Sequence, residues 1–259
     1  MHNIEYHSLY KEKAMNNWIE KIYKLLFPER CILCDDVIAN DAPFCSDCYQ
    51  LWSKQQKDEC VLCGKSLHEC ECIRLQSIKQ SVFLFWYSGE ALKSLIYRQK
   101  SFLCSKTNRF FATLMVNEIR SKIEPNKKGE LPFEVITYVP RSKKAVVKNG
   151  YDQAAELAKE LSKQLNIPCV CLVTRKRGGQ QQKKLGYTVR LANIKGVFHP
   201  NELCKSYKSV LLIDDVVTTG ATINAVADAL KNGGVRNVYC AAIAKTQQTF
   251  RRKPKAEKL

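Results

Sequence analysis

The chain has 259 residues, 45% of them hydrophobic, and can therefore bury a core in one large domain or two smaller ones. Its formal net charge of +17 indicates an anionic partner, either nucleic acid or a membrane surface. The sequence has no apolar run of about 20 residues and no apolar signal core at its N-terminus, so we expect a cytoplasmic protein without a transmembrane helix. In that compartment the 13 cysteines indicate metal binding rather than disulfides.

Residues 1–28 are predicted to form an amphipathic helix. Trp18, Ile22, Leu25 and Leu26 fall on one stripe, as in a helix that buries one face. Such a helix could touch a membrane surface. It could equally pack on its own protein or on a partner chain.

Residues 29–76 are predicted to form a cysteine-rich zinc ribbon module. A Cys-x-x-Cys turn presents two thiolates to one tetrahedral zinc ion, and such half-sites recur here in close succession. We expect two structural zinc ions that supply the folding energy of the segment. Pairing of the half-sites can be sequential or crossed, His68 could replace one ligand of the second site, and a redox-active cysteine pair is the alternative. The predicted metal ligands are Cys31, Cys34, Cys45 and Cys48 for one quartet, and Cys60, Cys63, Cys70 and Cys72 for the other.

Residues 77–246 alternate between apolar runs with strand composition and segments with helical periodicity. This alternation predicts an α/β domain with a doubly wound parallel sheet. The predicted strands are residues 81–87, 135–140, 169–173, 210–213 and 238–244, and the predicted helices are residues 91–100 and 107–123, one that follows Gln153 and one that ends at Gly233.

The stretch over residues 174–195 is basic and contains no acidic residue. Its glycines and glutamines indicate a flexible loop that could cover a phosphorylated ligand or follow the phosphate backbone of a single strand. A solvated basic face is the alternative. Residues 247–259 form a further basic tail that is predicted to be disordered. The candidate DNA-binding residues are Arg175, Lys176, Arg177, Lys183, Lys184 and Arg190.

Residues 210–223 carry the most specific chemistry. An apolar run of four residues ends in Asp214 and Asp215, as expected for a buried parallel strand whose carboxyl end faces a ligand. The Thr- and Gly-rich turn that follows offers N–H groups and hydroxyls at a helix N-terminus, which suits a phosphate. The two acids suit a vicinal diol or Mg²⁺, so the parts together predict a site for a ribose 5-phosphate. A buried strand followed by a helix that Thr218 or Thr219 caps is the alternative.

This stretch resembles the phosphoribosyl-pyrophosphate (PRPP) motif of type I phosphoribosyltransferases. The resemblance implies that Asp214 and Asp215 contact the ribose hydroxyls and that Mg²⁺ accompanies PRPP. It also implies that the loop after residue 140 holds the pyrophosphate, for which the planar guanidinium of Arg141 is well suited. The PRPP-binding residues so implied are Arg141, Ser142, Asp214, Asp215, Thr218, Thr219, Gly220, Ala221 and Thr222.

Leu26-Phe27-Pro28 before the cysteines, joined to this motif, resembles the ComF family of DNA-uptake competence proteins. The resemblance implies a competence factor that binds incoming single-stranded DNA during natural transformation. An active phosphoribosyltransferase and a zinc-dependent scaffold for helicase and uptake proteins remain open. Purine salvage transferases commonly have an Asp where Thr218 stands, and Thr is a poor general base, so no catalytic residue is identified. The spacing of the family's pattern is kept by Gln182, Leu185, Arg190, Asn193, Gly196 and Phe198.

Overall fold

We analysed a computed structural model of the chain. Its residues divide into two compact units, residues 1–55 and residues 56–259. Of the predicted N-terminal helix only a short piece is described, in which Leu25 and Leu26 are helical and exposed. The tail beyond residue 247 lies outside the described residues. The structure describes residues 25–26, 28–39, 42–54, 59–101, 105–142, 146–147, 150–176 and 196–247.

The first unit is built around one cysteine quartet and the helix α2 (Ser46–Lys54). Among the described residues of this unit the buried apolar side chains are few, and the largest are Trp52 and Phe44, whose rings stack at 5.4 Å between centroids. A core of this size is consistent with a segment whose folding energy comes from metal binding.

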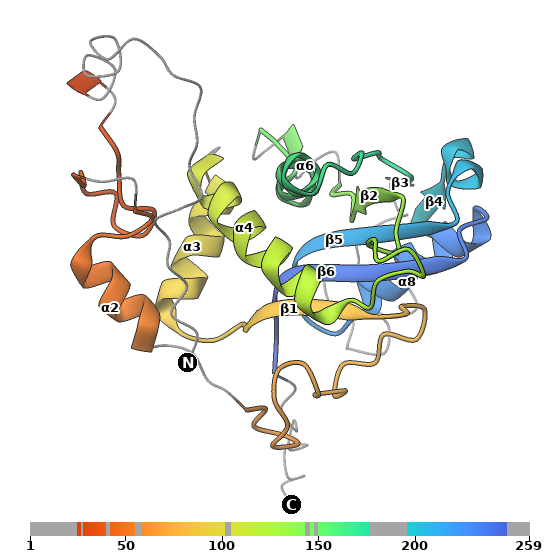
Figure 1. The fold of residues 1–259 in the computed structure, drawn as a ribbon, viewed down its shortest axis with the longest axis horizontal. Helices are drawn as coiled ribbons and strands as arrows, with labels where there is room; N and C mark the ends of the chain where they lie inside the picture. Colours follow the sequence, from red (N-terminus) through yellow and green to blue (C-terminus); the bar gives the residue numbers. More distant parts are fainter. Residues whose placement is uncertain are drawn as a thin grey trace, which may run out of the picture. The chain divides into compact units, whose positions relative to one another are not determined.

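The second unit contains a four-stranded parallel sheet, as the alternating pattern predicts (Figure 1). Its strands β5 and β6 lie in the middle and are buried almost throughout, which explains their long apolar runs. The strand order is β1 (Ser81–Trp86), β6 (Asn237–Lys245), β5 (Ser209–Val217) and β2 (Val135–Tyr138).

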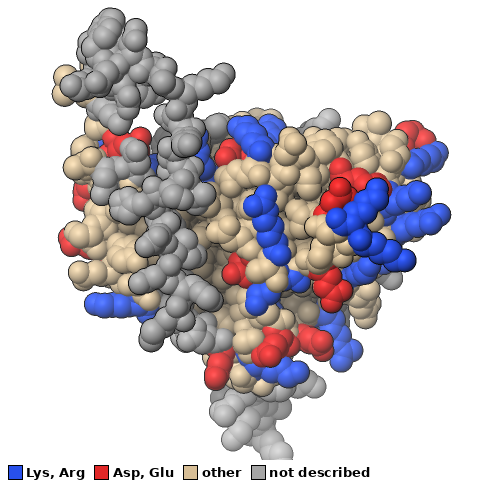
Figure 2. Space-filling model, viewed as in Figure 1, with Lys and Arg blue, Asp and Glu red and all other residues tan. Residues whose placement is uncertain are grey.

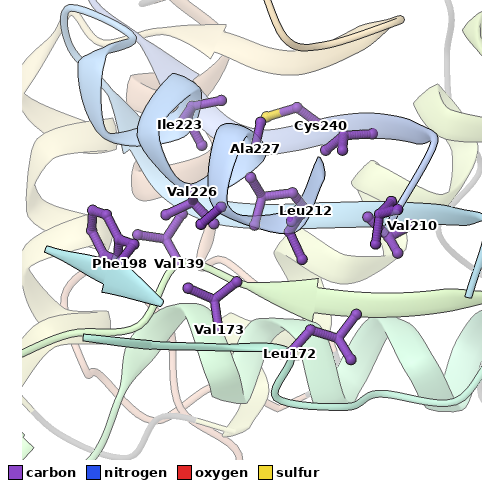
Figure 3. Packing of buried hydrophobic residues seen from close by; sticks show 14 of the residues in the cluster. Val139, Leu172, Val173, Phe198, Val210, Leu212, Ile223, Val226, Ala227 and Cys240 are labelled. Atoms are coloured by element: carbon purple, nitrogen blue, oxygen red, sulfur yellow. The ribbon is translucent and has the colours of Figure 1, made fainter. Parts of the chain in front are cut away.

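Helices cover both faces of this sheet. Val210 and Leu212 of β5 pack into one apolar cluster with α8 (Ala221–Asn232), as Figure 3 shows for Val226 and Ile223 of that helix. The alternate residues Leu211 and Ile213 point to the opposite face and are also fully buried. That face is covered by α4 (Ser105–Lys122) and α6 (Gln153–Leu165), and α3 (Glu90–Ser101) packs beside α4. The doubly wound arrangement is confirmed.

The chain between α6 and β5 differs from the prediction. The strand expected over residues 169–173 reaches β2 only around Ile136, whose N–H donates to the Pro168 carbonyl and whose carbonyl accepts from the Val170 N–H. Pro168 has no N–H with which to extend this ladder. The N–H of Leu172 donates instead to the Thr137 hydroxyl, at 3.3 Å. The chain then forms a separate antiparallel ribbon of β3 (Val173–Arg175) and β4 (Phe198–Pro200), followed by the 3-10 helix η2 (Glu202–Ser206).

Candidate functional site

Asp214 and Asp215 lie near the carboxyl end of β5. The neighbouring strand β2 stops at Tyr138, which pairs with Ile213, so both carboxylates stand just past the end of β2. Asp215 is 8% exposed and Asp214 is partly buried. Ligands of open α/β sheets bind outside the carboxyl ends of strands, which is where the sequence places this pair.

The loop that follows β2 reaches the same place. Arg141 donates from Nη2 to Oδ2 of Asp215 at 2.9 Å, and its backbone N–H donates to Oδ2 of Asp152 at 2.8 Å. Asp152 is also the N-cap of α6 and accepts from the Ala155 N–H at 3.4 Å. The start of α6 therefore fixes the backbone of Arg141, and the guanidinium joins the two loops that the sequence singled out.

The carboxyl of Asp214 is electrostatically unusual. Burial raises its pKa well above the ordinary value, and the neighbouring Asp215 carboxylate raises it further. A hydrogen bond from the Asp215 N–H to Oδ1 of Asp214, at 2.9 Å, acts in the opposite direction. An ionised Asp214 therefore favours a cation or a hydroxyl donor close by.

The turn between β5 and α8 has the shape of an anion cradle. Thr218 and Thr219 are exposed, and Gly220 adopts a left-handed conformation with φ 76°. Gly220, rather than either threonine, is the N-cap residue, and it provides no side-chain hydrogen bond to the helix. The Thr219 hydroxyl accepts from the Ala221 N–H at 3.3 Å. This arrangement leaves the positive end of the α8 dipole without a side-chain cap at Gly220.

Both cysteine quartets are assembled, and the pairing of half-sites is sequential. In each quartet the four sulfur atoms lie within 4.8 Å of one another. The separations of Cys34 from Cys45 (3.7 Å) and of Cys60 from Cys72 (4.0 Å) are close to the value of about 3.8 Å that four sulfurs at 2.3 Å around a tetrahedral zinc require. His68 is not a member of the second quartet, because its Nε2 lies 3.6 Å from Oε2 of Glu118. The residues present fit two structural zinc ions.

The first halves of the quartets repeat one local structure. Each Cys-x-x-Cys turn begins directly after an antiparallel bridge, Arg30 with Val37 and Glu59 with Ser66. Each is followed by a residue with positive φ, Asp35 at 73° and Gly64 at 68°. This shared turn is the knuckle of a zinc ribbon, and its recurrence explains why the sequence pattern is so specific.

One thiol of each quartet is prepared for metal. Burial acts to raise the pKa of Cys31, but hydrogen bonds from backbone N–H groups outweigh it and lower the pKa to about 7. The same balance lowers the pKa of Cys60 to about 7. The thiolate is the form of cysteine that binds zinc, so a lowered pKa at one thiol of each knuckle favours metal binding.

The predicted DNA-binding residues are described only in part. Arg175 and Lys176 are exposed at the end of β3, and the guanidinium of Arg175 lies 5.5 Å from the Phe198 ring centroid in β4. Lys176 donates its N–H to the Val197 carbonyl at 3.0 Å, so the β3–β4 ribbon holds both ends of the basic stretch together. Arg177, Lys183, Lys184 and Arg190 lie outside the described residues. Figure 2 shows Lys and Arg interspersed with Asp and Glu on this face, with several close together near β4.

Two site residues escaped the sequence interpretation. Asp152 carries an ordinary helix N-cap signal, an Asp before a helical pattern, but nothing in the sequence links it to Arg141. Lys245 ends β6 and is 2% exposed, with Nζ donating to the Cys70 carbonyl of the second quartet at 2.9 Å. A lysine at the end of an apolar strand carries no signal that it will be buried against a metal site.

Comparison with known proteins agrees with this geometry. The family model of the phosphoribosyl transferase domain matches residues 151–258, and that of the double zinc ribbon domain matches residues 22–76. Competence protein F of Haemophilus influenzae is 30% identical over 233 residues, which cover 85% of this chain and 98% of that protein. The chain belongs to the ComF family of competence proteins.

Other ComF relatives support the assignment. Competence protein ComFC of Bacillus subtilis is 26% identical over 239 residues, which cover 82% of this chain and 91% of that protein. The DNA utilization protein YhgH of Escherichia coli is 30% identical over 118 residues, which cover 45% of this chain and 51% of that protein. Among the described residues of this ComF protein, no helix has the length and hydropathy to cross a membrane.

Proposed function

We propose that this ComF protein is a DNA-uptake competence factor that binds incoming single-stranded DNA in the cytoplasm during natural transformation. We further propose that PRPP or a related ribose phosphate, with Mg²⁺, binds at the carboxyl end of β5. The relatives that match most of the chain are named for competence, and a relative that matches part of it is named for DNA utilization. These names support the first proposal, and the site geometry supports the second.

One observation carries the ligand proposal. The ion pair of Arg141 with Asp215 brings the loop after β2 against the acidic pair of β5. A ligand that carries a ribose diol and a pyrophosphate can contact both loops only if they lie within the length of one ligand molecule. In the proposed complex the carboxylates of Asp214 and Asp215 accept from the ribose hydroxyls or bind Mg²⁺, and Arg141 and Ser142 donate to the pyrophosphate.

The 5-phosphate is assigned to the turn before α8. Residues 218–222 supply the hydroxyls of Thr218, Thr219 and Thr222 and the N–H groups of Gly220 and Ala221. An anion at this position interacts favourably with the positive end of the helix dipole. Mg²⁺ offsets the charge that PRPP would otherwise bring against two carboxylates.

The DNA proposal rests on charge and on how the basic stretch is anchored. Seven basic residues and no acid occur over residues 174–195. The two described ends of the stretch are held side by side by the β3–β4 ribbon, and its basic residues are proposed to engage several successive phosphates. Phosphate neutralisation releases counterions and gives affinity without sequence preference.

Transfer of the phosphoribosyl group to an unknown acceptor is the second candidate. The convergence of both loops at Asp215 favours it, because a transferase needs the same ligand geometry. Against it, Thr218 is exposed at the position where a general base would be needed, and a hydroxyl is a poor base. Turnover of PRPP in the presence of bases, measured as pyrophosphate release, distinguishes a transferase from a ligand-binding site.

Two titrations of zinc-loaded protein test the proposal. Calorimetry with PRPP is run with and without Mg²⁺, with ribose 5-phosphate and pyrophosphate as comparison ligands. Anisotropy of labelled oligo-dT is run across a salt series, with a duplex of equal length beside it. Absence of oligo-dT binding near physiological salt would remove the DNA proposal. Equal affinity for PRPP and pyrophosphate would remove the role of the acidic pair.

A further inference from the structure

The segment that leaves the second cysteine quartet lies directly on the phosphate loop. We define the strap as residues 73–75 and the phosphate loop as residues 218–222. A Cβ added at Gly220 would lie 2.8 Å from Cγ2 of Ile73 and 2.9 Å from Cδ2 of Leu75. The backbone of the phosphate loop is therefore in contact with the strap, and any larger residue here would displace the Ile73 and Leu75 side chains. Glycine at position 220 therefore permits both the positive φ of this residue and the close approach of the strap.

Hydrogen bonds continue the contact along α8. Asn224 donates from Nδ2 to the Arg74 carbonyl at 2.9 Å, and its N–H closes the first turn of the helix on the Gly220 carbonyl, also at 2.9 Å. One turn further on, the Ser77 hydroxyl donates to Oδ1 of Asp228. The strap is thus attached to the helix that begins at the phosphate loop, as well as to the loop itself.

A second link reaches the other side of the phosphate loop through β6. Lys245 pairs with Val217, the last residue of β5. The next residue, Thr246, donates its N–H to the Val217 carbonyl at 2.9 Å and its hydroxyl to the Thr218 carbonyl at 2.8 Å. Because the Lys245 ammonium donates to the Cys70 carbonyl, the second quartet is linked to the loop from this side through Lys245 and Thr246. Figure 1 shows the segment that carries this quartet beside the end of β6.

The buried ammonium connects this arrangement to metal. Lys245 lies over the Phe83 and Trp86 rings at 5.0 and 4.9 Å from their centroids, and its Nζ donates to the Cys70 carbonyl. A buried cation is costly unless a negative charge is close. Four thiolates around one Zn²⁺ would place a net negative charge beside this ammonium, and the metal would fix the Cys70 backbone that accepts from it. Zinc would therefore stabilise Lys245, the strap and the knuckle together.

We infer that the second quartet, the strap and Lys245 form a positioning element for the phosphate loop, so that zinc at this quartet and a phosphoribosyl ligand at the loop strengthen each other's binding. The ligand half of this inference rests on the proposed function. The first quartet lies in the other compact unit and serves as the comparison site. Linkage of this kind is reciprocal, so the ligand must also raise the affinity of the second quartet for zinc.

Cys63→Ser tests the metal side, because Cys63 is the exposed ligand of the second quartet, and Cys34→Ser in the first quartet is the matched control. Hydrogen exchange is measured over residues 217–224 in wild type and both variants. We expect Cys63→Ser to lose one zinc and to speed exchange in this segment by roughly 5–150-fold, the usual range of coupling between sites. Cys34→Ser should lose one zinc and leave the segment unchanged. Unchanged exchange in Cys63→Ser after loss of its zinc would overturn the inference.

Asn224→Ala tests the strap without touching a ligand, and Asn232→Ala in the last turn of α8 is its control. We expect Asn224→Ala to keep both zinc ions, to speed exchange over residues 217–224, and to release zinc faster to a chelator. The affinity for PRPP should fall about tenfold in this variant. In wild type, bound PRPP should slow the release of zinc. If wild type does not bind PRPP, the proposed function fails, while exchange and chelator release still decide the positioning role. Equal exchange and equal zinc release in the two asparagine variants would refute that role.

Discussion

The guanidinium of Arg141 donates from Nη2 to Oδ2 of Asp215 at 2.9 Å across 74 residues of sequence. The two side chains are 24% and 11% exposed, so solvent screens the pair only weakly. The contact joins the loop after β2 to the acidic pair of β5. In the absence of ligand it also compensates the charge of Asp215, so that a bound pyrophosphate must compete with that carboxylate for Arg141.

Coupling between Arg141 and Asp215 is expected to be measurable. In a double-mutant cycle with Arg141→Ala and Asp215→Asn, followed by urea unfolding, we expect a coupling free energy of about 1.5–3 kcal/mol, the range for hydrogen bonds to charged groups. The exposed pair of Lys205 with Glu202 is the control and should give a clearly smaller coupling, because solvent screens it. Equal values for both pairs would show that the Arg141 contact is an ordinary surface ion pair.

Asp214→Asn should stabilise the ligand-free protein. Because burial and Asp215 raise its folded pKa, the stability that Asp214 contributes is fully present below the ordinary Asp pKa and is lost as pH rises through the raised value. The Tm gain of the variant should therefore be absent near pH 4 and grow toward neutral pH. Each kcal/mol corresponds to about 2–4 °C in a domain of this size. A Tm difference that is constant between pH 4 and 8 would contradict the raised pKa.

Removal of both carboxylates should abolish binding of Mg-PRPP. In Asp214→Ala with Asp215→Ala, each lost charged hydrogen bond is worth roughly 1.5–3 kcal/mol, so affinity should fall at least a hundredfold. Calorimetry measures the affinity, and circular dichroism confirms that the fold is retained. Glu124→Ala with Glu202→Ala removes the same charge from exposed positions and should bind normally. Undiminished affinity in the aspartate variant would make the acidic pair purely structural.

Purified protein should contain two zinc ions per chain. The motivation is the two assembled cysteine quartets, and elemental analysis gives the ratio directly. A strong chelator should unfold the first unit, whose apolar core is small, because metal binding supplies the folding energy of such modules. A ratio near one would remove one of the two sites, and a ratio near zero would remove both.

Single-stranded DNA binding should depend steeply on salt. Each lost phosphate contact flattens the log–log slope by about 0.7 for a single strand, so Arg175→Ala with Lys176→Ala and Arg177→Ala should flatten it by up to about 2. Anisotropy of labelled oligo-dT across a salt series gives both slope and affinity.

A control variant for this experiment removes three positive charges near the amino ends of the central strands. The control substitutions are Lys208→Ala, Lys231→Ala and Arg236→Ala. These residues are exposed near the amino ends of β5 and β6 and the C-terminus of α8. This variant should keep the slope of wild type. If both triple variants flatten the slope equally, binding follows net charge and the basic stretch is not the contact surface. If neither does, the surface lies elsewhere, such as the basic tail.

Much of this fold was predictable because its signals are local. The apolar run before Asp214 predicts β5, and the chain ends α8 at the residue before Gly233, as the pattern indicates. The membership of the cysteine quartets follows from short spacings, because a zinc knuckle is built from adjacent residues. The strand expected over residues 169–173 was wrong in its extent, because the Leu172 N–H donates to the Thr137 hydroxyl instead of continuing the ladder, and apolar content does not specify a partner strand.

Only the tertiary structure determined the contacts between segments that are distant in the sequence. Sequential pairing of half-sites, the position of His68 beside Glu118 and the ion pair of Arg141 with Asp215 each depend on which faces pack together. The position of Lys245 beside the second quartet is the clearest case, because 175 residues separate it from Cys70. A strand's composition reports that it is buried, whereas the register of β6 against β5 determines what its last side chain meets. For that reason the turn between β5 and α8 was predictable from sequence, and the strap that contacts it was not.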